Sequence, residues 1–104
     1  MRPSSEIIRV LRQGRVVSSR RVVVYVAPGA GQSRAAWIAG RKVGSAVARN
    51  RARRVLREAW NALVVEVPAG YGMVFVARPD IRGAKTQDVV EELGQTLARA
   101  GVTR

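Results

Sequence analysis

The chain has 104 residues, of which 47% are hydrophobic, so length and composition predict one folded domain over residues 1–104 and argue against disorder. It contains no histidine and no cysteine, which excludes the usual proton shuttle, disulfides and thiolate metal sites; we predict no catalytic and no metal-binding residues. The formal net charge is +12, and residues 1–57 hold 14 of the 19 basic residues but one acid, Glu6, which predicts a polyanionic partner.

The N-terminal part of the chain predicts a helix followed by a strand. Residues 3–6, Pro-Ser-Ser-Glu, are typical of a helix start, because a serine can cap the first turn and an acid follows it. Gly14 is the expected end of this helix. Residues 16–27 are rich in β-branched residues and predict a strand, which a break near Ser18 and Ser19 would divide in two.

The middle of the chain predicts a turn, a second strand and the longest helix. Residues 28–33 contain proline and two glycines and predict the turn. Residues 35–42 predict a strand, and we expect it to pair with residues 16–27 as a hairpin. Ser45 is the expected cap of a helix over roughly residues 46–65.

The last part of the chain predicts one more strand and one more helix. Residues 71–78 predict the strand, and Thr86 is the expected cap of a helix that runs to about Ala100. We interpret Glu91 and Glu92 as the exposed surface of that helix. The order is therefore roughly α-β-β-(β)-α-β-α, which predicts an α/β fold, more closely an α+β sandwich, in which helices pack on a single small sheet.

The stretch RNRARR, residues 49–54, lies in the longest predicted helix. On an ideal helix the apolar positions gather on one face: Ala48, Ala52, Val55, Leu56, Ala59, Ala62 and Leu63. The opposite face carries the basic positions, with Arg51 near the boundary: Arg49, Asn50, Arg53, Arg54 and Arg57. A plain solvated surface would interleave acids, because stacked like charges destabilise a helix. The pattern favours a phosphate-binding face, in which the Asn50 amide can also donate and accept hydrogen bonds.

The aromatic residues predict a core and one candidate for nucleic-acid contact. Trp60 and Phe75 are interpreted as core residues. Tyr25 shares strand parity with Val23 and Ala27, so it can lie on an exposed sheet face as a platform for stacked bases. A buried tyrosine whose hydroxyl group is hydrogen-bonded fits the same pattern, and both interpretations stay open here.

Residues 40–60, GRKVGSAVARNRARRVLREAW, resemble the protein subunit of bacterial ribonuclease P. That family has a Lys-Val/Ile-Gly-x-Ala-Val-x-Arg-Asn-Arg stretch that continues into further basic residues and ends in Arg-Glu/Gln-Ala-aromatic. The matching residues follow the same order and spacing: Lys42, Val43, Gly44, Ala46, Val47, Arg49, Asn50, Arg51, Arg53, Arg54, Arg57, Ala59 and Trp60. Residues 7–26 and 68–81 are also similar to the family, so the resemblance covers nearly the whole chain.

The resemblance implies a sandwich fold with an unusual left-handed β-α-β crossover. It also implies a protein that binds a catalytic RNA and, together with it, removes the 5′ leader of precursor tRNA, while the RNA carries the reaction with bound Mg²⁺. The RNA-binding residues that it implies are Lys42, Arg49, Asn50, Arg51, Arg53, Arg54 and Arg57. A cleft between the sheet and the first helix would receive the leader, with Ile7, Leu11 and Tyr25 in it. The family commonly has Phe where this chain has Ile7 and Leu11, so Trp37 is a further candidate for leader contact.

Other classes of function are weighed against this resemblance. A small ribosomal-type RNA-binding protein or an RNA chaperone without a role in cleavage would share the basic helix and the sheet. The missing proton shuttle disfavours a protein nuclease that acts alone. The order of strands around the basic helix disfavours a helix-turn-helix protein that reads DNA. No apolar run predicts a membrane span or a signal peptide, so we expect a cytoplasmic protein with no obligate protein partner.

Overall fold

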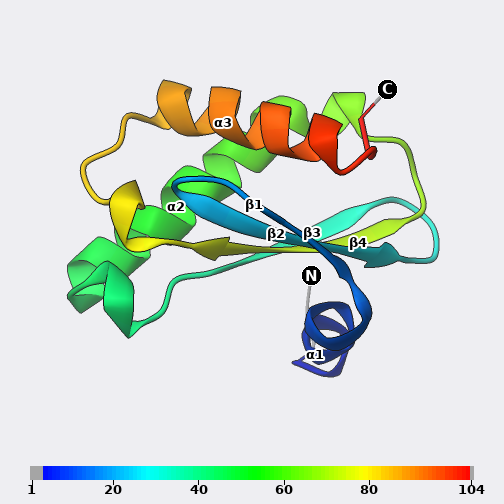
Figure 1. Ribbon diagram of the computed structural model, residues 1–104, viewed down its shortest axis with the longest axis horizontal. Coiled ribbons are helices and arrows are strands. Elements are labelled where there is room, and N and C mark those ends of the chain that lie inside the picture. Colours follow the sequence, from blue (N-terminus) through cyan, green and yellow to red (C-terminus); the bar gives the residue numbers. More distant parts are fainter. Residues whose placement is uncertain (1–3, 104) are drawn as a thin grey trace.

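The computed structural model describes residues 4–103, in which three α-helices surround one four-stranded sheet (Figure 1). The helices and strands in chain order are α1 (Ser4–Gln13), β1 (Arg15–Ser18), β2 (Val22–Pro28), β3 (Arg34–Ile38), α2 (Ala46–Leu63), β4 (Tyr71–Ala77) and α3 (Thr86–Arg99). Short 3₁₀ turns lie at Arg41–Val43, Val64–Glu66 and Pro79–Ile81. The predicted α+β sandwich and the predicted break after Ser18 are confirmed. The expected start of the first helix at Pro3 lies outside the described residues.

The order of strands in the sheet is β1-β2-β4-β3. Strands β1 and β2 form an antiparallel hairpin, in which Val17 is paired with Val24, and β4 is antiparallel to β2. Strand β3 is parallel to β4, with Ala36 paired with Val74. The prediction that residues 35–42 form a hairpin with the preceding strand is therefore wrong. Helix α2 links β3 to β4 as a crossover, which parallel neighbours require, and β4 lies between β3 and β2.

The main core lies between one face of the sheet and helices α2 and α3, which Figure 1 shows together on that side. Strand β2 turns Val22, Val24 and Val26 toward this core, as its period of two requires. Phe75 of β4 is fully buried there, and its ring lies 5.8 Å from that of Trp60, centroid to centroid. The prediction that these two aromatic residues belong to the core is confirmed.

Helix α2 buries the apolar face that the sequence predicts: Ala52, Val55, Leu56, Ala59 and Leu63. Ala48 is half-buried, whereas Ala62 is exposed, so its predicted place on the core face is wrong. Leu63 also packs close to Gly94 of α3, where a Cβ atom would lie 3.5 Å from a Leu63 methyl carbon. Helix α3 begins one residue earlier than predicted, since Lys85 and not Thr86 is its N-cap residue.

Of the helices within residues 4–103, only α1 covers the second face of the sheet (Figure 1). Val10 of α1 is fully buried against Ala27 and Val74 in a small separate cluster. Gly14 ends the helix, where its N–H donates to the Val10 carbonyl at 2.8 Å. No helix within residues 4–103 has the length and apolar character needed to span a membrane.

Candidate nucleic-acid interface

Helix α2, which carries the basic residues, begins at Ala46, and two residues separate it from the end of the 3₁₀ turn Arg41–Val43. Gly44 has φ 135°, a conformation that residues with a side chain rarely adopt, and a Cβ there would lie 3.3 Å from the Cβ of Ala48. Ser45 is the N-cap residue, as predicted, and its Oγ accepts a hydrogen bond from the Ala48 N–H at 3.2 Å. The start of the helix therefore sets the direction in which the arginines that follow it project.

We use the term basic face for the side of α2 formed by Arg49, Asn50, Arg53, Arg54 and Arg57. Asn50, Arg54 and Arg57 are exposed, and Arg49 and Arg53 are half-buried. Within the basic face, Arg53 Nη2 donates a hydrogen bond to Asn50 Oδ1. This bond holds the Arg53 guanidinium beside the Asn50 side chain and leaves the Asn50 amide N–H groups available to a ligand.

Acidic side chains neutralise little of the basic face. Glu58 lies 4.0 Å from Arg54, but the two side chains are 46% and 58% exposed, and such pairs contribute about 0–1 kcal/mol. Within residues 4–103, Arg49 and Arg57 make no side-chain hydrogen bond and no ion pair. Like charges one turn apart destabilise a helix by a few tenths of a kcal/mol per pair, roughly. A bound polyanion would relieve this repulsion.

Arg51 lies at the boundary between the two faces of α2, as predicted. It is half-buried, and its Nη2 donates a 2.7 Å hydrogen bond to the carbonyl of Ala84. This bond ties α2 to the segment that precedes α3, so one of the predicted RNA-binding residues has a structural partner. Arg51 and Arg82 nevertheless both line a pocket of 130 Å³ with Gly83.

The structure brings together three of the four residues predicted to contact the leader between the first helix and the sheet. Ile7 and Leu11 of α1 and Tyr25 of β2 are half-buried around the cluster of Val10, Ala27 and Val74. The Tyr25 side chain is thus neither fully buried nor fully exposed, because part of it packs against this cluster and part of it stays accessible. We use the term α1 cleft, after the prediction, for the region formed by Ile7, Leu11 and Tyr25 around this cluster.

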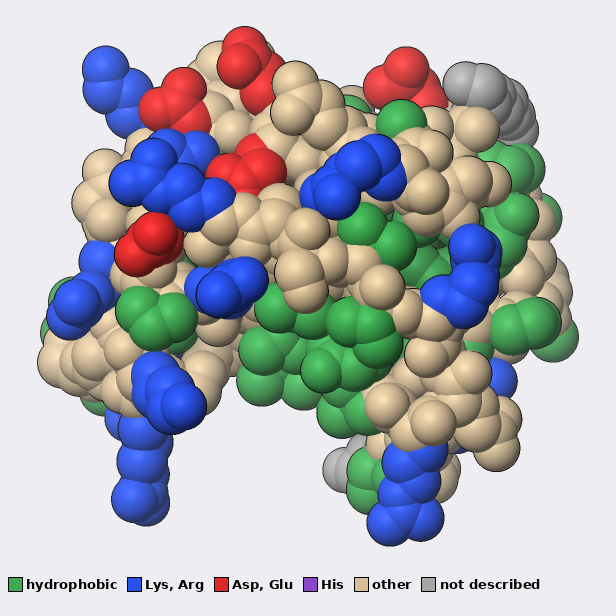
Figure 2. Space-filling view, viewed as in Figure 1, with side chains coloured by type: hydrophobic (Ala, Val, Ile, Leu, Met, Phe, Trp, Pro, Cys, Tyr) green, Lys and Arg blue, Asp and Glu red, His purple; other side chains and the backbone are tan. Residues whose placement is uncertain are grey.

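The open part of this sheet face continues the apolar surface of the α1 cleft. Val16 of β1 is paired with Tyr25, so its side chain lies on the same face, and it is 53% exposed. Ile38 and Val76 belong to the same face and are half-buried. Figure 2 shows an apolar patch in a hollow on the lower side of the molecule, with cationic side chains to either side of it.

Trp37 does not lie in the α1 cleft, so its prediction as a leader-contact residue there is wrong. It is paired with Phe75 and packs against the main core, on the opposite face of the sheet from Tyr25. The reason is the period of two along a strand, which turns Ala36 and Ile38 toward α1 and Trp37 away from it. The face could not be assigned from the sequence because the parallel pairing of β3 with β4 was not predicted.

Further cationic residues line a pocket at the end of β3 and β4, close to the start of α2. Lys42 was predicted to bind RNA, but it belongs to the 3₁₀ turn before α2 and not to the basic face. With Arg41 and Arg78 it lines a pocket of 490 Å³, whose apolar wall includes Val76 and Pro79. Sequence reasoning missed Arg41 and Arg78. Arg41 stands beside a predicted residue, whereas Arg78 reaches this pocket only through the pairing of β4 with β3.

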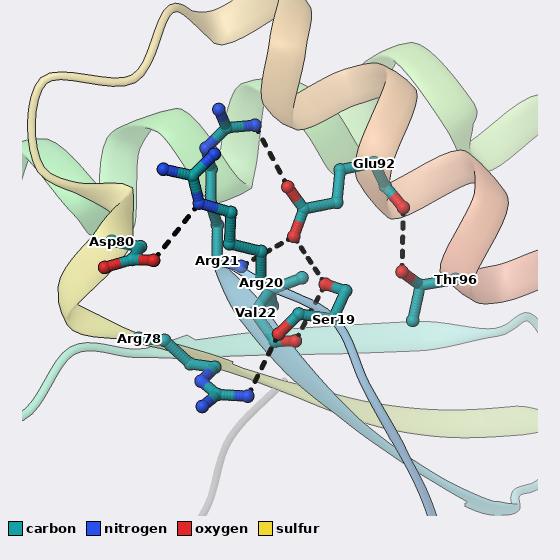
Figure 3. A network of polar contacts seen from close by, with 8 residues as sticks. All are labelled: Ser19, Arg20, Arg21, Val22, Arg78, Asp80, Glu92 and Thr96. Carbon is teal, nitrogen blue, oxygen red and sulfur yellow. Dashed lines mark hydrogen bonds and ion pairs between the residues drawn. The ribbon is translucent and has the colours of Figure 1, made fainter.

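A polar network holds the β1–β2 turn against α3 (Figure 3). The Glu92 carboxylate accepts hydrogen bonds from Ser19 Oγ at 2.5 Å, from the Arg21 backbone N–H at 2.6 Å and from Arg21 Nη1 at 3.0 Å. The side chains of Arg21 and Glu92 are 21% and 15% exposed. Glu91 is exposed, as predicted, but the prediction that Glu92 lies on the helix surface is wrong. The Arg21 guanidinium group is thus paired with a carboxylate of the protein itself.

Two more cations bind the backbone of the same turn. Arg99 Nη2 donates to the Ser18 carbonyl at 2.9 Å, and Arg78 Nη1 donates to the Ser19 carbonyl at 3.1 Å. Arg20 forms an exposed ion pair with Asp80 at 3.1 Å.

No group of three or more metal-ligating His, Cys, Asp or Glu side chains occurs in the described part of the chain.

Comparisons with known proteins identify one family. The model of the ribonuclease P family matches residues 1–101 of this chain. A ribonuclease P protein component of Pelotomaculum thermopropionicum is 42% identical over 97 residues, which cover 92% of this chain and 87% of that protein. One from Symbiobacterium thermophilum is 38% identical over 95 residues, covering 89% of this chain and 83% of that protein.

Solved structures show the same fold. The ribonuclease P protein of Staphylococcus aureus superposes with a TM-score of 0.88 at 24% identity, over 100% of this chain and 96% of that one. The ribonuclease P protein of Thermotoga maritima superposes with a TM-score of 0.84 at 24% identity, over 95% of this chain and 94% of that one. At this identity the likeness bears on the fold, and it confirms the sandwich.

Proposed function

This chain belongs to the ribonuclease P protein family, and on that premise we propose that it is the non-catalytic subunit of an RNA-based endonuclease. In this proposal it binds the catalytic RNA and the 5′ leader of precursor tRNA, and it assists the removal of that leader. The observation that carries the proposal is the basic face of α2, where Arg49 and Arg57 have no internal partner within residues 4–103.

The basic face would bind the phosphates of a structured RNA. Arginine presents a planar fork of donors that matches a phosphate group, and each phosphate it neutralises releases condensed counterions. Asn50 adds a group that can donate to a ribose hydroxyl group or a base edge. Because α2 is fixed by the main core on its opposite side, these side chains are presented by a rigid element.

The α1 cleft would receive the single-stranded leader. Its surface is apolar and includes Tyr25, on which a base can stack without regard to its identity. Ile7 and Leu11 offer van der Waals contact but no aromatic ring, so stacking in this cleft rests on Tyr25. Single-stranded RNA suits such a surface because its bases can be splayed out, whereas those of a duplex are stacked and paired.

The bond-breaking step is assigned to the RNA subunit in this proposal. The RNA would bind the Mg²⁺ that activates water for attack on the phosphodiester bond. The residues of this chain would hold and orient the RNA subunit and the precursor tRNA. The positive charge of the protein would lower the repulsion between these two RNA molecules. We therefore assign no catalytic residue and no metal ligand to the protein.

Cleavage of a precursor tRNA at low Mg²⁺ concentration tests the proposal. The catalytic RNA is assayed alone, then with this protein, and the protein is also assayed alone. We expect efficient cleavage in the combination and none by the protein alone. Cleavage by the protein alone would overturn the proposal, and tight RNA binding without any effect on cleavage would favour a general RNA-binding protein.

A further inference from the structure

A second pocket with basic walls lies at the end of the sheet remote from the basic face of α2. It has a volume of 170 Å³ and is bounded by α1, the β2–β3 loop and the first residues of β4. The lining residues whose side chains carry functional groups are Glu6, Arg9, Gln32, Arg34 and Tyr71. We call it the Arg9–Arg34 pocket. The RNA-binding and leader-contact residues that the resemblance implies do not include any of these residues, and neither does the basic stretch at residues 49–54.

The charges in the Arg9–Arg34 pocket are poorly satisfied within the protein. Arg9 is half-buried and has no side-chain hydrogen bond or ion pair within residues 4–103. Arg34 is 62% exposed, and its nearest acid, Glu6, lies at 4.0 Å, the outer limit of an ion pair. A pair at this distance whose arginine is exposed contributes little to stability, so a stronger acceptor can displace Glu6 from Arg34.

The loop wall of the pocket is held rigidly by hydrogen bonds to the segment before β4. Gly29 N–H donates to the Gly70 carbonyl, and Gly70 N–H donates to the Gly31 carbonyl, both at 2.9 Å. Ser33 Oγ donates to the Pro68 carbonyl at 2.6 Å and accepts from the Tyr71 N–H at 3.1 Å. A ligand would therefore meet a wall that is already ordered, which lowers the entropy cost of binding.

The position of the pocket connects it to the α1 cleft. Arg34 has the same strand parity as Ala36 and Ile38, so it lies on the sheet face that α1 covers. Strand β3 runs from Arg34 at this end to Ile38, about 13 Å away at the usual rise per residue, and the basic end at Lys42 lies beyond it. Cationic pockets therefore flank the apolar surface at both ends.

We propose that the Arg9–Arg34 pocket binds a phosphate group of RNA, with Arg9 and Arg34 as donors and Glu6 as the internal acceptor that the phosphate displaces. The proposal rests on the proposed function, because it takes RNA as the ligand. Two guanidinium groups can donate to the phosphate oxygens in the forked geometry that arginine favours. The Gln32 amide is a further donor in the same pocket. The phosphate can belong to the leader of the precursor or to the RNA subunit.

The test compares Arg9→Gln and Arg34→Gln with Arg20→Gln, a charge-matched control. Arg20 is 72% exposed and also pairs with an acid, Asp80, but it lies in the β1–β2 turn and not in the pocket. Two affinities are measured for each variant: that of the protein for the RNA subunit, and that of the assembled holoenzyme for precursors with a short and a long leader. Thermal unfolding confirms that each variant is folded.

We expect each pocket variant to weaken one of these affinities about fivefold to tenfold more than Arg20→Gln does. A loss confined to the long-leader precursor assigns the phosphate to the leader, and a loss in binding of the RNA subunit assigns it to that RNA. Glu6→Gln should act in the opposite direction and tighten the same affinity, whereas Asp80→Asn should not.

Equal effects of Arg9→Gln, Arg34→Gln and Arg20→Gln on every affinity would overturn the pocket. The proposed function has a separate outcome, because it concerns the unsubstituted protein. If that protein supports cleavage at low Mg²⁺ while the pocket variants behave like the control, the function stands and the phosphate site does not. If the unsubstituted protein neither binds the RNA subunit nor aids cleavage, the proposed function itself is wrong.

Discussion

Replacement of Arg49 and Arg57 by glutamine tests whether the basic face of α2 binds phosphate groups. Both side chains lack an internal partner within residues 4–103, so their loss removes charge without breaking a bond that the structure shows. Glutamine keeps the helix propensity of the side chain. Because Arg53 lies one turn from each of them, the double variant also removes two like-charged neighbour pairs. We expect the free energy of unfolding to stay the same or to rise by a few tenths of a kcal/mol.

The size of the effect on RNA binding follows from counterion release. Removal of one phosphate contact lowers the slope of log K against log salt concentration by roughly 0.7–0.9. Removal of two would lower it by about 1.4–1.8, which corresponds to roughly 25- to 60-fold weaker binding at about 0.1 M salt. An effect confined to affinity, with an unchanged slope, would mean that these arginines do not bind phosphates.

The assay is a titration of the RNA subunit with protein at several salt concentrations. The control variant carries Arg12→Gln and Arg15→Gln, which removes the same charge from exposed residues at the end of α1 and the start of β1. If the control lowers the slope as much as the double variant on α2, the total charge and not the basic face determines binding. That result would refute the reasoning.

Two further predictions concern the α1 cleft and the network at the β1–β2 turn. Tyr25→Ala should weaken binding of the holoenzyme to leader-bearing precursor by about 1–3 kcal/mol, the usual value for a stacked base, and leave the binding of mature tRNA unchanged. The control is Trp37→Leu, on the opposite sheet face. Equal losses of affinity for both RNAs would contradict the stacking role of Tyr25. Glu92→Gln should lower the free energy of unfolding by about 2–4 kcal/mol in urea denaturation, because the half-buried Arg21 loses its carboxylate partner, whereas Glu91→Gln should change it little.

The sequence predicted the local elements well because local signals determine them. Gly14, Ser45 and the β-branched run before Ala27 act on their own neighbours in the chain, and the structure has a helix end, a helix cap and a strand there. The amphipathic pattern of α2 likewise follows from its own residues. Ala62 was the exception, since the width of the buried face depends on what packs against it.

The pairing of the strands could not be predicted in the same way. The same local signals fit two arrangements: a hairpin between β2 and β3, or a crossover that places β4 between them. Contacts between residues distant in sequence decide which arrangement forms. Because the pairing of β3 with β4 was not predicted, the sheet face of Trp37 could not be assigned. For the same reason the sequence did not show that Arg78 and Lys42 line one pocket. The role of Glu92 was missed for the same reason, because its partners Ser19 and Arg21 come from the first hairpin.

The structure also changes how the charge of this chain should be counted. The sequence shows 14 basic residues in residues 1–57, but the structure does not leave all of them equally available to a bound RNA. Arg21 is paired with Glu92 in a mostly buried contact, and Arg51 uses one donor on the Ala84 carbonyl. The number of phosphates bound should therefore follow the cations without internal partners, such as Arg49 and Arg57, and fall below the number of basic residues. A salt slope that required all 14 as phosphate ligands would mean that binding of RNA opens the β1–β2 network and releases Arg21.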